Sequence, residues 1–308
     1  MTLIDPAQGK DTTGNQAQAP GPEAGPAFHI AKPAAGGPRT PLIFASPHSG
    51  NVYPAEMTEA MAVEEAQVRR SEDAFVDRLI ASAPQAGASV ITAGFGRAYI
   101  DLNRDPWELD PAMFEDELPP YVQGRTARVA AGLGAIAKLA GEGQKIYARK
   151  LRFEEARARI ETAHRPYHDA LTRLIGEACS AHGTAILIDW HSMPSAAAKG
   201  VVTPRHGKGC DIVLGDRFGA ACAPGLTRLV EKTLEELDYR VVRNAPYAGG
   251  YTTEFYGRPG RRVHALQIEI DRGLYLDETT LEPTDGLARL KESVERLTAV
   301  LAGGWQGI

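Results

Sequence analysis

The apolar run Ala-Ile-Leu-Ile at residues 185–188 constrains the fold more than any other part of the sequence. It is apolar without alternation, which is typical of a strand at the centre of a mostly parallel sheet covered on both faces. The longest helical pattern, residues 151–181 with an interruption at Pro166, comes shortly before it. A helix that leads into a buried strand is the building unit of α/β domains. The sequence therefore predicts a mixed, mostly parallel central sheet flanked by helices.

The rest of the chain from residue 41 continues this alternation of short apolar runs and longer amphipathic stretches. A Pro-rich, acidic stretch at 105–122 has no clear period, so we expect an irregular surface excursion there. Further strands are predicted at 41–45, 89–93, 98–102, 211–214, 239–242 and 263–268, and further helices at 56–83, 226–237 and 286–301.

Composition predicts one domain with a tail. Residues 1–38 are rich in Gly, Pro and Ala and are expected to form a flexible tail, whereas 39–308 are expected to form a single α/β domain. The formal net charge of -5, without a basic cluster, argues against a nucleic-acid partner. Because neither a membrane span nor a secretory signal is found, we expect a cytoplasmic protein. Three cysteines without a C-x-x-C pair argue against a disulfide framework or a thiolate zinc site.

Polar residues follow several predicted strands. Open α/β sheets bind ligands at the carboxyl ends of their strands, so these residues are the candidates for a functional site. They are Ser46-Pro47-His48-Ser49-Gly50, Asn103-Arg104, Asp189-Trp190-His191-Ser192, and Glu269 with Asp271-Arg272.

His48 and His191 are candidate metal ligands because each follows an apolar strand at a matching position. Two imidazoles and one carboxylate are a common ligand set of hydrolytic zinc, with a fourth position open for water. Asp73 is the candidate carboxylate if its helix turns it inward. The alternatives are a turn histidine bonded to the backbone and, for Asp73, a solvated charge beside Glu72 and Asp77.

Arg97, Asn103 and Arg104 lie within eight residues and bracket one predicted strand. A guanidinium with an adjacent amide suits recognition of a carboxylate, and the alternative is a structural salt bridge from Arg104 to a neighbouring aspartate. Glu269 ends an apolar strand, where burial would raise its basicity and make it a general base; the alternative is an edge-strand charge.

The pair Gly249-Gly250, followed by Thr253, predicts a flexible loop that closes over a substrate. It has neither the G-K-[ST] ending nor the G-x-G-x-x-G spacing of phosphate-binding loops.

Taken in order, the His48 segment, the Asp73 helix, Arg97 with Asp101-Leu102-Asn103-Arg104, the His191 segment, the Gly-Gly loop, and residues 264–269 resemble the N-formylglutamate amidohydrolase (deformylase) family. The resemblance covers nearly the whole chain after residue 40. It implies a hydrolase fold like that of the zinc exopeptidases, related to zinc carboxypeptidases and aspartoacylases.

The resemblance also implies roles for individual residues. His48, Asp73 and His191 would bind one Zn²⁺ per chain. Asn103 and Arg104 would hold the substrate α-carboxylate, and Gly249, Gly250 and Thr253 would line the substrate. Glu269 would act as the general base, and Arg97 would stabilise the oxyanion.

The wider group of carboxypeptidases places an acidic ligand three residues after the first histidine, where this chain has Asn51. The third ligand must therefore come from elsewhere, with Asp73 the first choice and Glu72 the second. The expected reaction is the zinc-dependent hydrolysis of N-formyl-L-glutamate or a similar N-acyl amino acid, a small-molecule substrate. The alternatives are a related zinc hydrolase for another N-acyl amino acid or small peptide, and a non-catalytic carboxylate-binding protein.

Overall fold

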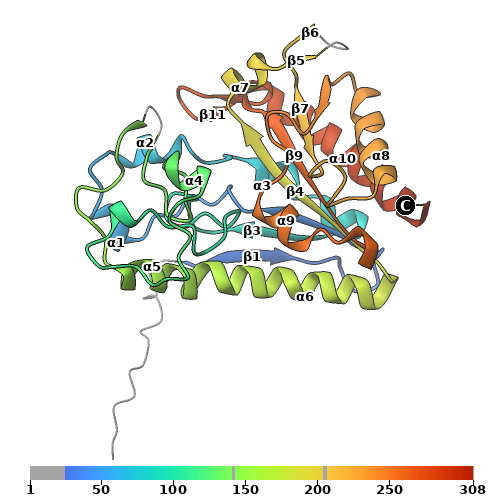
Figure 1. Cartoon of the computed structure of the whole chain (residues 1–308). Coiled ribbons are helices and arrows are strands. Elements are labelled where there is room, and N and C mark those ends of the chain that lie inside the picture. Colours follow the sequence, from blue (N-terminus) through green and yellow to red (C-terminus); the bar gives the residue numbers. More distant parts are fainter. Residues whose placement is uncertain (1–24, 141–142, 204–206, 308) are drawn as a thin grey trace, which may run out of the picture.

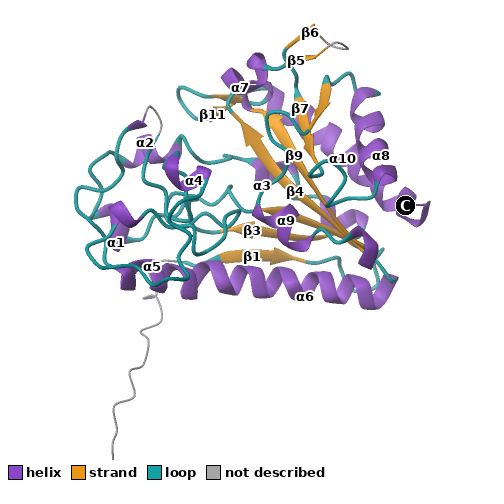
Figure 2. Cartoon of the chain, viewed as in Figure 1, coloured by secondary structure: helices purple, strands orange, loops and turns teal. Residues whose placement is uncertain are grey.

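A seven-stranded sheet forms the centre of the computed structural model, which describes residues 25–140, 143–203 and 207–307 (Figures 1 and 2). Its strands lie in the order β1-β3-β2-β4-β9-β7-β8. They are β1 (Phe28–Ala31), β3 (Ser89–Ala93), β2 (Leu42–Ser46), β4 (Ala185–Met193), β9 (Val263–Asp271), β7 (Ile212–Gly215) and β8 (Val241–Arg243). Two small ribbons pair β5 (Val202–Thr203) with β6 (Gly207–Lys208) and β10 (Leu276–Asp277) with β11 (Glu282–Pro283).

The sheet is mixed but mostly parallel, which confirms the predicted fold class. Strands β3, β2, β4 and β9 are parallel to one another. Strand β7 runs antiparallel to β9 and parallel to β8, and β1 runs antiparallel to β3 at the other edge. The carboxyl ends of β2, β4 and β9 therefore meet at one side of the sheet.

Helices cover both faces of the sheet (Figure 2). Successive residues of a strand point to opposite faces, so Ile43 and Leu187 pack on the side of α6 whereas Phe44 and Ile188 pack on the side of α8 and α10. The helices are α1 (Ala55–Thr58), α2 (Glu65–Arg69), α3 (Val76–Leu79), α4 (Ala127–Ala130), α5 (Phe153–Arg159), α6 (Arg165–His182), α7 (Ser195–Gly200), α8 (Pro224–Glu235), α9 (Tyr251–Tyr256) and α10 (Gly286–Gly304). Short 3₁₀ turns lie at Ala83–Ala86, Pro111–Met113, Pro259–Arg261, Arg272–Leu274 and Trp305–Gly307.

The predicted helix at 151–181 is α5 and α6 joined by a π-helical turn at Ile160–His164. Pro166 lies in the first turn of α6 and has no N–H to donate into the preceding turn, which is where the helical hydrogen bonding is of the π type. The interruption expected at Pro166 therefore falls in the turn that precedes it.

The central strands β4 and β9 are longer than predicted. The apolar runs end at Ile188 and Ile268, but the parallel ladder continues through His191 opposite Glu269 to Met193 opposite Asp271. Two of the predicted site residues therefore lie within strands rather than after them, where backbone pairing fixes their positions.

Three other expectations were wrong. Strand β1 lies inside the predicted tail, because Phe28 packs edge-on against Tyr167 and the segment pairs with β3. Residues 56–83 form short helices instead of one long helix, and Phe75 has a left-handed backbone with φ of 65°. Residues 98–102 form a loop, in which Asp101 N donates to Ala135 O instead of to a neighbouring strand, and the Asp101 side chain accepts from Asn103 N. Residues 1–24 of the predicted tail lie outside the described part of the chain.

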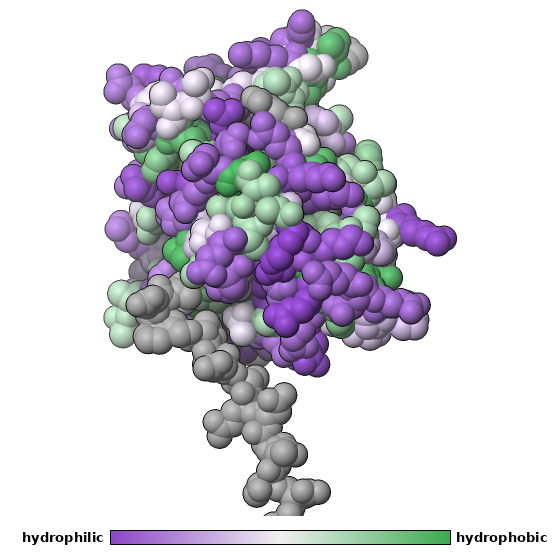
Figure 3. Space-filling model, turned by 90° about the vertical axis from the view of Figure 1, so that its left-hand side faces the viewer, coloured by the Kyte–Doolittle hydropathy of each residue, from purple (hydrophilic) through white to green (hydrophobic). Residues whose placement is uncertain are grey.

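The face formed by the loop-rich segments around α1, α2 and α4 is mostly hydrophilic, with small apolar patches (Figure 3). Among the described residues, no helix has the length and hydropathy required to cross a membrane.

Candidate active site

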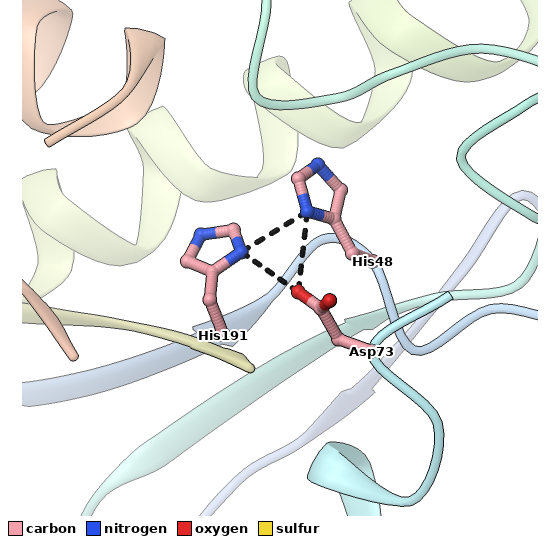
Figure 4. Close-up of side chains that lie close together, drawn as sticks. All are labelled: His48, Asp73 and His191. Atoms are coloured by element: carbon pink, nitrogen blue, oxygen red, sulfur yellow. Dashed lines mark hydrogen bonds and ion pairs between the residues drawn. The ribbon is translucent and has the colours of Figure 1, made fainter. Parts of the chain in front are cut away.

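Three predicted metal ligands meet at the carboxyl ends of β2 and β4 (Figure 4). His48 follows β2, Asp73 lies in the turn before α3, and His191 belongs to β4. His191 Nδ1 lies 3.0 Å from His48 Nδ1 and 3.1 Å from Asp73 Oδ2, and His48 Nδ1 lies 3.3 Å from the same oxygen. All three side chains are buried. The second choice, Glu72, is directed elsewhere: its carboxylate accepts hydrogen bonds from Tyr53 Oη and Arg69 Nε.

The atoms that face one another form a donor set for a cation. His48 Nε2 donates to Asp101 Oδ1 at 2.7 Å, so His48 Nδ1 carries a lone pair. That lone pair faces an Asp73 oxygen at 3.3 Å, and two acceptors at this distance require a positive charge between them. Burial lowers the pKa of His191, but Asp189 and Asp73 outweigh it and raise the pKa well above its usual value. A proton on His191 supplies the charge in the metal-free chain, and a divalent cation fits the same ligand set.

Further charged side chains hold each ligand. Asp101 holds His48, and Asp189 Oδ2 lies 3.0 Å from His191 Nε2. Arg272 Nη2 donates to Asp73 Oδ1 at 2.9 Å, which leaves Oδ2 directed at the two imidazoles. Burial opposes ionisation of Asp73, but the hydrogen bond from His191 and the charge of Arg272 keep its pKa well below its usual value. Such partners orient metal ligands and fix their protonation.

Glu269 lies beside the ligands because it is paired with His191 across β4 and β9. Its Oε1 accepts a hydrogen bond from Gln267 Nε2 at 2.8 Å. Burial is the largest influence on this carboxyl group and, with the nearby Asp73, raises its pKa to about 7 against the opposing charges of His191 and two arginines. A carboxylate with this pKa can exchange a proton near neutral pH.

A cavity of about 420 Å³ opens onto these groups. It is lined by the three ligands and Glu269, by Arg97 and Arg104, and by the loop around Gly249 and Gly250. Arg97 Nη2 donates to Asp101 Oδ2 at 2.7 Å. Burial acts to lower the pKa of Arg97, but the negative charges of Asp101, Asp73 and Glu269 raise it, so the guanidinium stays charged. The cavity therefore brings together the three candidate metal ligands, a buried carboxyl group with a pKa of about 7 and a charged guanidinium.

Arg104 does not form the structural salt bridge that was its alternative reading. Its Nε donates to Leu133 O at 3.0 Å and its Nη1 to Asn103 O at 2.9 Å. Within the described ranges its guanidinium has no ion pair with a carboxylate, whereas Arg97 is the partner of Asp101. Arg104 is thus a cation in the cavity wall without a carboxylate partner among the described residues.

Asn103 and the Gly-Gly loop form one hydrogen-bonded unit. Asn103 Oδ1 accepts from Thr252 N at 2.8 Å, and its Nδ2 lies 3.1 Å from His191 Nε2. Gly250 N donates to Gln267 Oε1 at 2.7 Å, and Thr253 Oγ1 donates to Gly250 O at 2.9 Å. The Thr253 side chain therefore stabilises the loop, and Gln267 binds the loop to β9. Its closure over a substrate stays a prediction.

Sequence reasoning missed the roles of Asp101 and Arg272 as partners of the ligands. Both stand in segments that contain other candidates, but nothing in the local sequence indicates which side chain each contacts. His264 accepts from Ala223 N at 3.3 Å near the start of β9, away from the ligands, whereas Asp189 lies beside His191.

Comparisons with known proteins agree with this geometry. A family model described as N-formylglutamate amidohydrolase matches residues 40–276. N-formylglutamate deformylases of Pseudomonas putida and Pseudomonas aeruginosa are 32% and 31% identical over 274 and 242 residues, covering 86% and 78% of this chain and 94% and 84% of the relatives. The crystal structure of N-formylglutamate amidohydrolase from Ralstonia eutropha JMP134 superposes with a TM-score of 0.85 and 38% identity, covering 92% of this chain and 99% of that one. The chain therefore belongs to the N-formylglutamate amidohydrolase family.

Proposed function

We propose that this protein hydrolyses the formyl amide of N-formyl-L-glutamate to formate and L-glutamate, and that it requires one zinc ion bound by His48, Asp73 and His191. The observation that carries the proposal is the meeting of these three side chains in one cavity with Glu269. The activity named for the relatives supports the choice of substrate. The donor set of two imidazole nitrogens and one carboxylate oxygen supports the choice of metal.

When bound, zinc supplies a Lewis acid that polarises the formyl carbonyl and makes water more acidic. The chain's own residues do the remaining work. Glu269 accepts a proton from the attacking water, and its pKa of about 7 lets it return that proton to the leaving amine. Glu269 thus acts in turn as base and acid.

Arg97 and Arg104 provide the charge that the substrate needs. Arg97 is fixed by Asp101, so its remaining N–H groups can stabilise the oxyanion that develops on the formyl oxygen. Arg104, which lacks an anionic partner of its own among the described residues, binds the substrate α-carboxylate beside Asn103. Gly249 and Gly250 complete the cavity wall.

The test is a measurement of bound metal together with formate release from N-formyl-L-glutamate. We expect about one zinc per chain, loss of activity with a chelator, and recovery when zinc is returned. His191→Gln should lose both metal and activity, whereas His29→Gln, which changes an exposed histidine of β1, should lose neither. Stoichiometric metal without formate would refute the substrate, and release from N-acetyl-L-glutamate or a dipeptide would then identify a related hydrolase. Chelator-insensitive formate release would refute the role of the metal.

A further inference from the structure

The charges that line the cavity are unevenly paired. Its acidic residues are Asp73, Asp101 and Glu269, and two arginines are bound to the first two. Arg104 and Arg128 also line the cavity. Among the described residues, Arg104 bonds only to backbone carbonyls, and Arg128 forms one long ion pair, in which its Nη1 lies 3.5 Å from Glu108 Oε2. With Glu108 counted, the wall that carries these two arginines still has one positive charge in excess.

The two guanidinium groups are close enough to affect each other. Burial lowers the pKa of Arg104, and repulsion from Arg97 and Arg128 lowers it further, against the attraction of Asp101 and Glu108. Positive charges that are removed from water and repel one another are costly unless an anion joins them. Glu108 offsets only one of these two charges, and Arg104 has no ion pair with a carboxylate among the described residues, which indicates that the ligand itself brings negative charge.

A short hydrogen-bonded turn holds both arginines. Helix α4 begins at the cap Thr126, whose Oγ1 accepts from Val129 N at 3.1 Å. The backbone oxygen of Arg128 then accepts from Leu133 N at 2.9 Å, and Leu133 O accepts from Arg104 Nε at 3.0 Å. The same turn that carries Arg128 thus fixes Arg104. Leu133 O holds the guanidinium of Arg104 and Glu108 holds that of Arg128, so both groups are positioned before a ligand arrives, which lowers the entropic cost of binding.

The turn also approaches the loop at 105–110 closely. A Cβ on Gly134 would lie 2.4 Å from Glu108 O, so no larger residue fits there without a shift of the backbone. Ala135 N donates to the same oxygen at 2.7 Å. The backbone of the turn that carries Arg128 therefore has little freedom to move.

From these contacts we propose that Arg128 binds the side-chain carboxylate of the substrate and makes the enzyme selective for acidic N-formyl amino acids. Arg104 binds the α-carboxylate at the same time. A guanidinium binds a carboxylate through two parallel N–H groups, so two such groups in one cavity match the two carboxylates of a short dicarboxylic acid. This inference rests on the proposed function, because it assigns the specificity of the same reaction.

The test compares kcat/KM for N-formyl-L-glutamate and N-formyl-L-glutamine, which differ in the charge of one side-chain group. The metal-loaded wild type should prefer the glutamate substrate. Arg128→Gln should lose that preference. Its kcat/KM for N-formyl-L-glutamate should fall by ~10- to 100-fold, the usual effect of losing one charged hydrogen-bonding partner, whereas kcat/KM for N-formyl-L-glutamine should change little. Arg128→Lys, which keeps the charge, should retain part of the preference. Arg125→Gln, an exposed arginine three residues earlier, should keep the wild-type ratio.

The outcomes separate this inference from the proposed function. Hydrolysis of both substrates with the same ratio in wild type and Arg128→Gln would refute the role of Arg128 and leave the proposed function standing. An equal fall on both substrates would refute it too, because a residue that reads the side chain acts only on the charged substrate. If the wild type released no formate from either substrate, both the proposed function and this assignment would be wrong.

Discussion

The substitution Asp101→Asn should weaken metal binding and catalysis through two separate contacts. Asp101 accepts from His48 Nε2 at 2.7 Å, from Arg97 Nη2 at 2.7 Å and from its neighbour Asn103 N at 2.9 Å. Asparagine has one oxygen in place of two. If that oxygen faces His48, its NH₂ group faces Arg97; in the opposite orientation the NH₂ group faces His48. Either orientation leaves a buried donor facing another donor.

The expected magnitudes follow from these contacts. Loss of a carboxylate that orients a metal-binding histidine weakens metal affinity by about 10- to 100-fold. Breaking one side of a buried ion pair costs about 3–5 kcal/mol, and because the Arg97 side chain is 21% exposed we expect the lower end, about 3 kcal/mol of unfolding free energy. Activity should fall further than metal occupancy, since the loosened Arg97 no longer faces the oxyanion.

Three measurements on one preparation check this prediction: a zinc titration against a competing chelator, urea unfolding, and formate release at saturating zinc. Asp105→Asn is the matched control, because within the described part of the chain the Asp105 side chain accepts a single hydrogen bond, from Trp107 N at 2.9 Å, and asparagine can keep that bond. If Asp101→Asn bound zinc as tightly as the wild type, the argument that Asp101 fixes His48 would be wrong. A fall in metal affinity with full activity at saturating zinc would instead contradict the role given to Arg97.

Three further predictions concern the base, a buried histidine and the loop. Glu269→Gln should lower kcat roughly 100- to 10,000-fold while metal content is retained, as measured by formate release and metal analysis; an unchanged kcat would rule out the general base. Burial, with the neighbouring His164, lowers the pKa of His168 to about 3 against about 6.5 in the unfolded chain, so the unfolded chain binds more protons between these values. Stability from this group should be complete above pH 6.5 and fall as the pH drops toward 3, and urea unfolding of His168→Gln should show a smaller fall than the wild type. Gly250→Ala would place a Cβ 2.4 Å from Asn103 Nδ2, so it should cost about 1–3 kcal/mol of unfolding free energy; Gly260→Ala, with open space around it, should be neutral in the same assay.

The sequence was most informative where a residue's position follows from a buried strand. His191 and Glu269 stand just beyond apolar runs, and the central pairing of β4 with β9 brings them together as expected from that pattern. Asp73 was expected on a long helix, but it lies in a turn, where its backbone N–H donates to His48 O at 2.9 Å. Its inward direction comes from this tertiary contact, which has no periodic signal in the sequence.

The contacts of the arginine side chains show more clearly what could not be predicted from the sequence. Arg97, Arg104 and Arg128 lie in loops or on a single helical turn, where side-chain direction depends on hydrogen bonds to distant carbonyls such as Leu133 O. The presence of a guanidinium group could be read from the sequence, but not whether it contacts Asp101, a backbone carbonyl or Glu108. Partner choice in such segments is decided by three-dimensional packing, which propensity and spacing do not describe.

His191 and Glu269 lie opposite each other on two central strands. The candidate active site is therefore built on the part of the molecule that is best protected from solvent. Both residues lie on nine-residue strands buried along nearly their whole length. Such strands open to solvent only when the whole domain unfolds, so their amide hydrogens should be among the slowest to exchange. Activity and global folding should consequently disappear together on heating or in denaturant. A single-residue insertion early in β9 would turn Glu269 to the opposite face of the sheet, whereas insertions of the same size in surface loops leave the alignment intact.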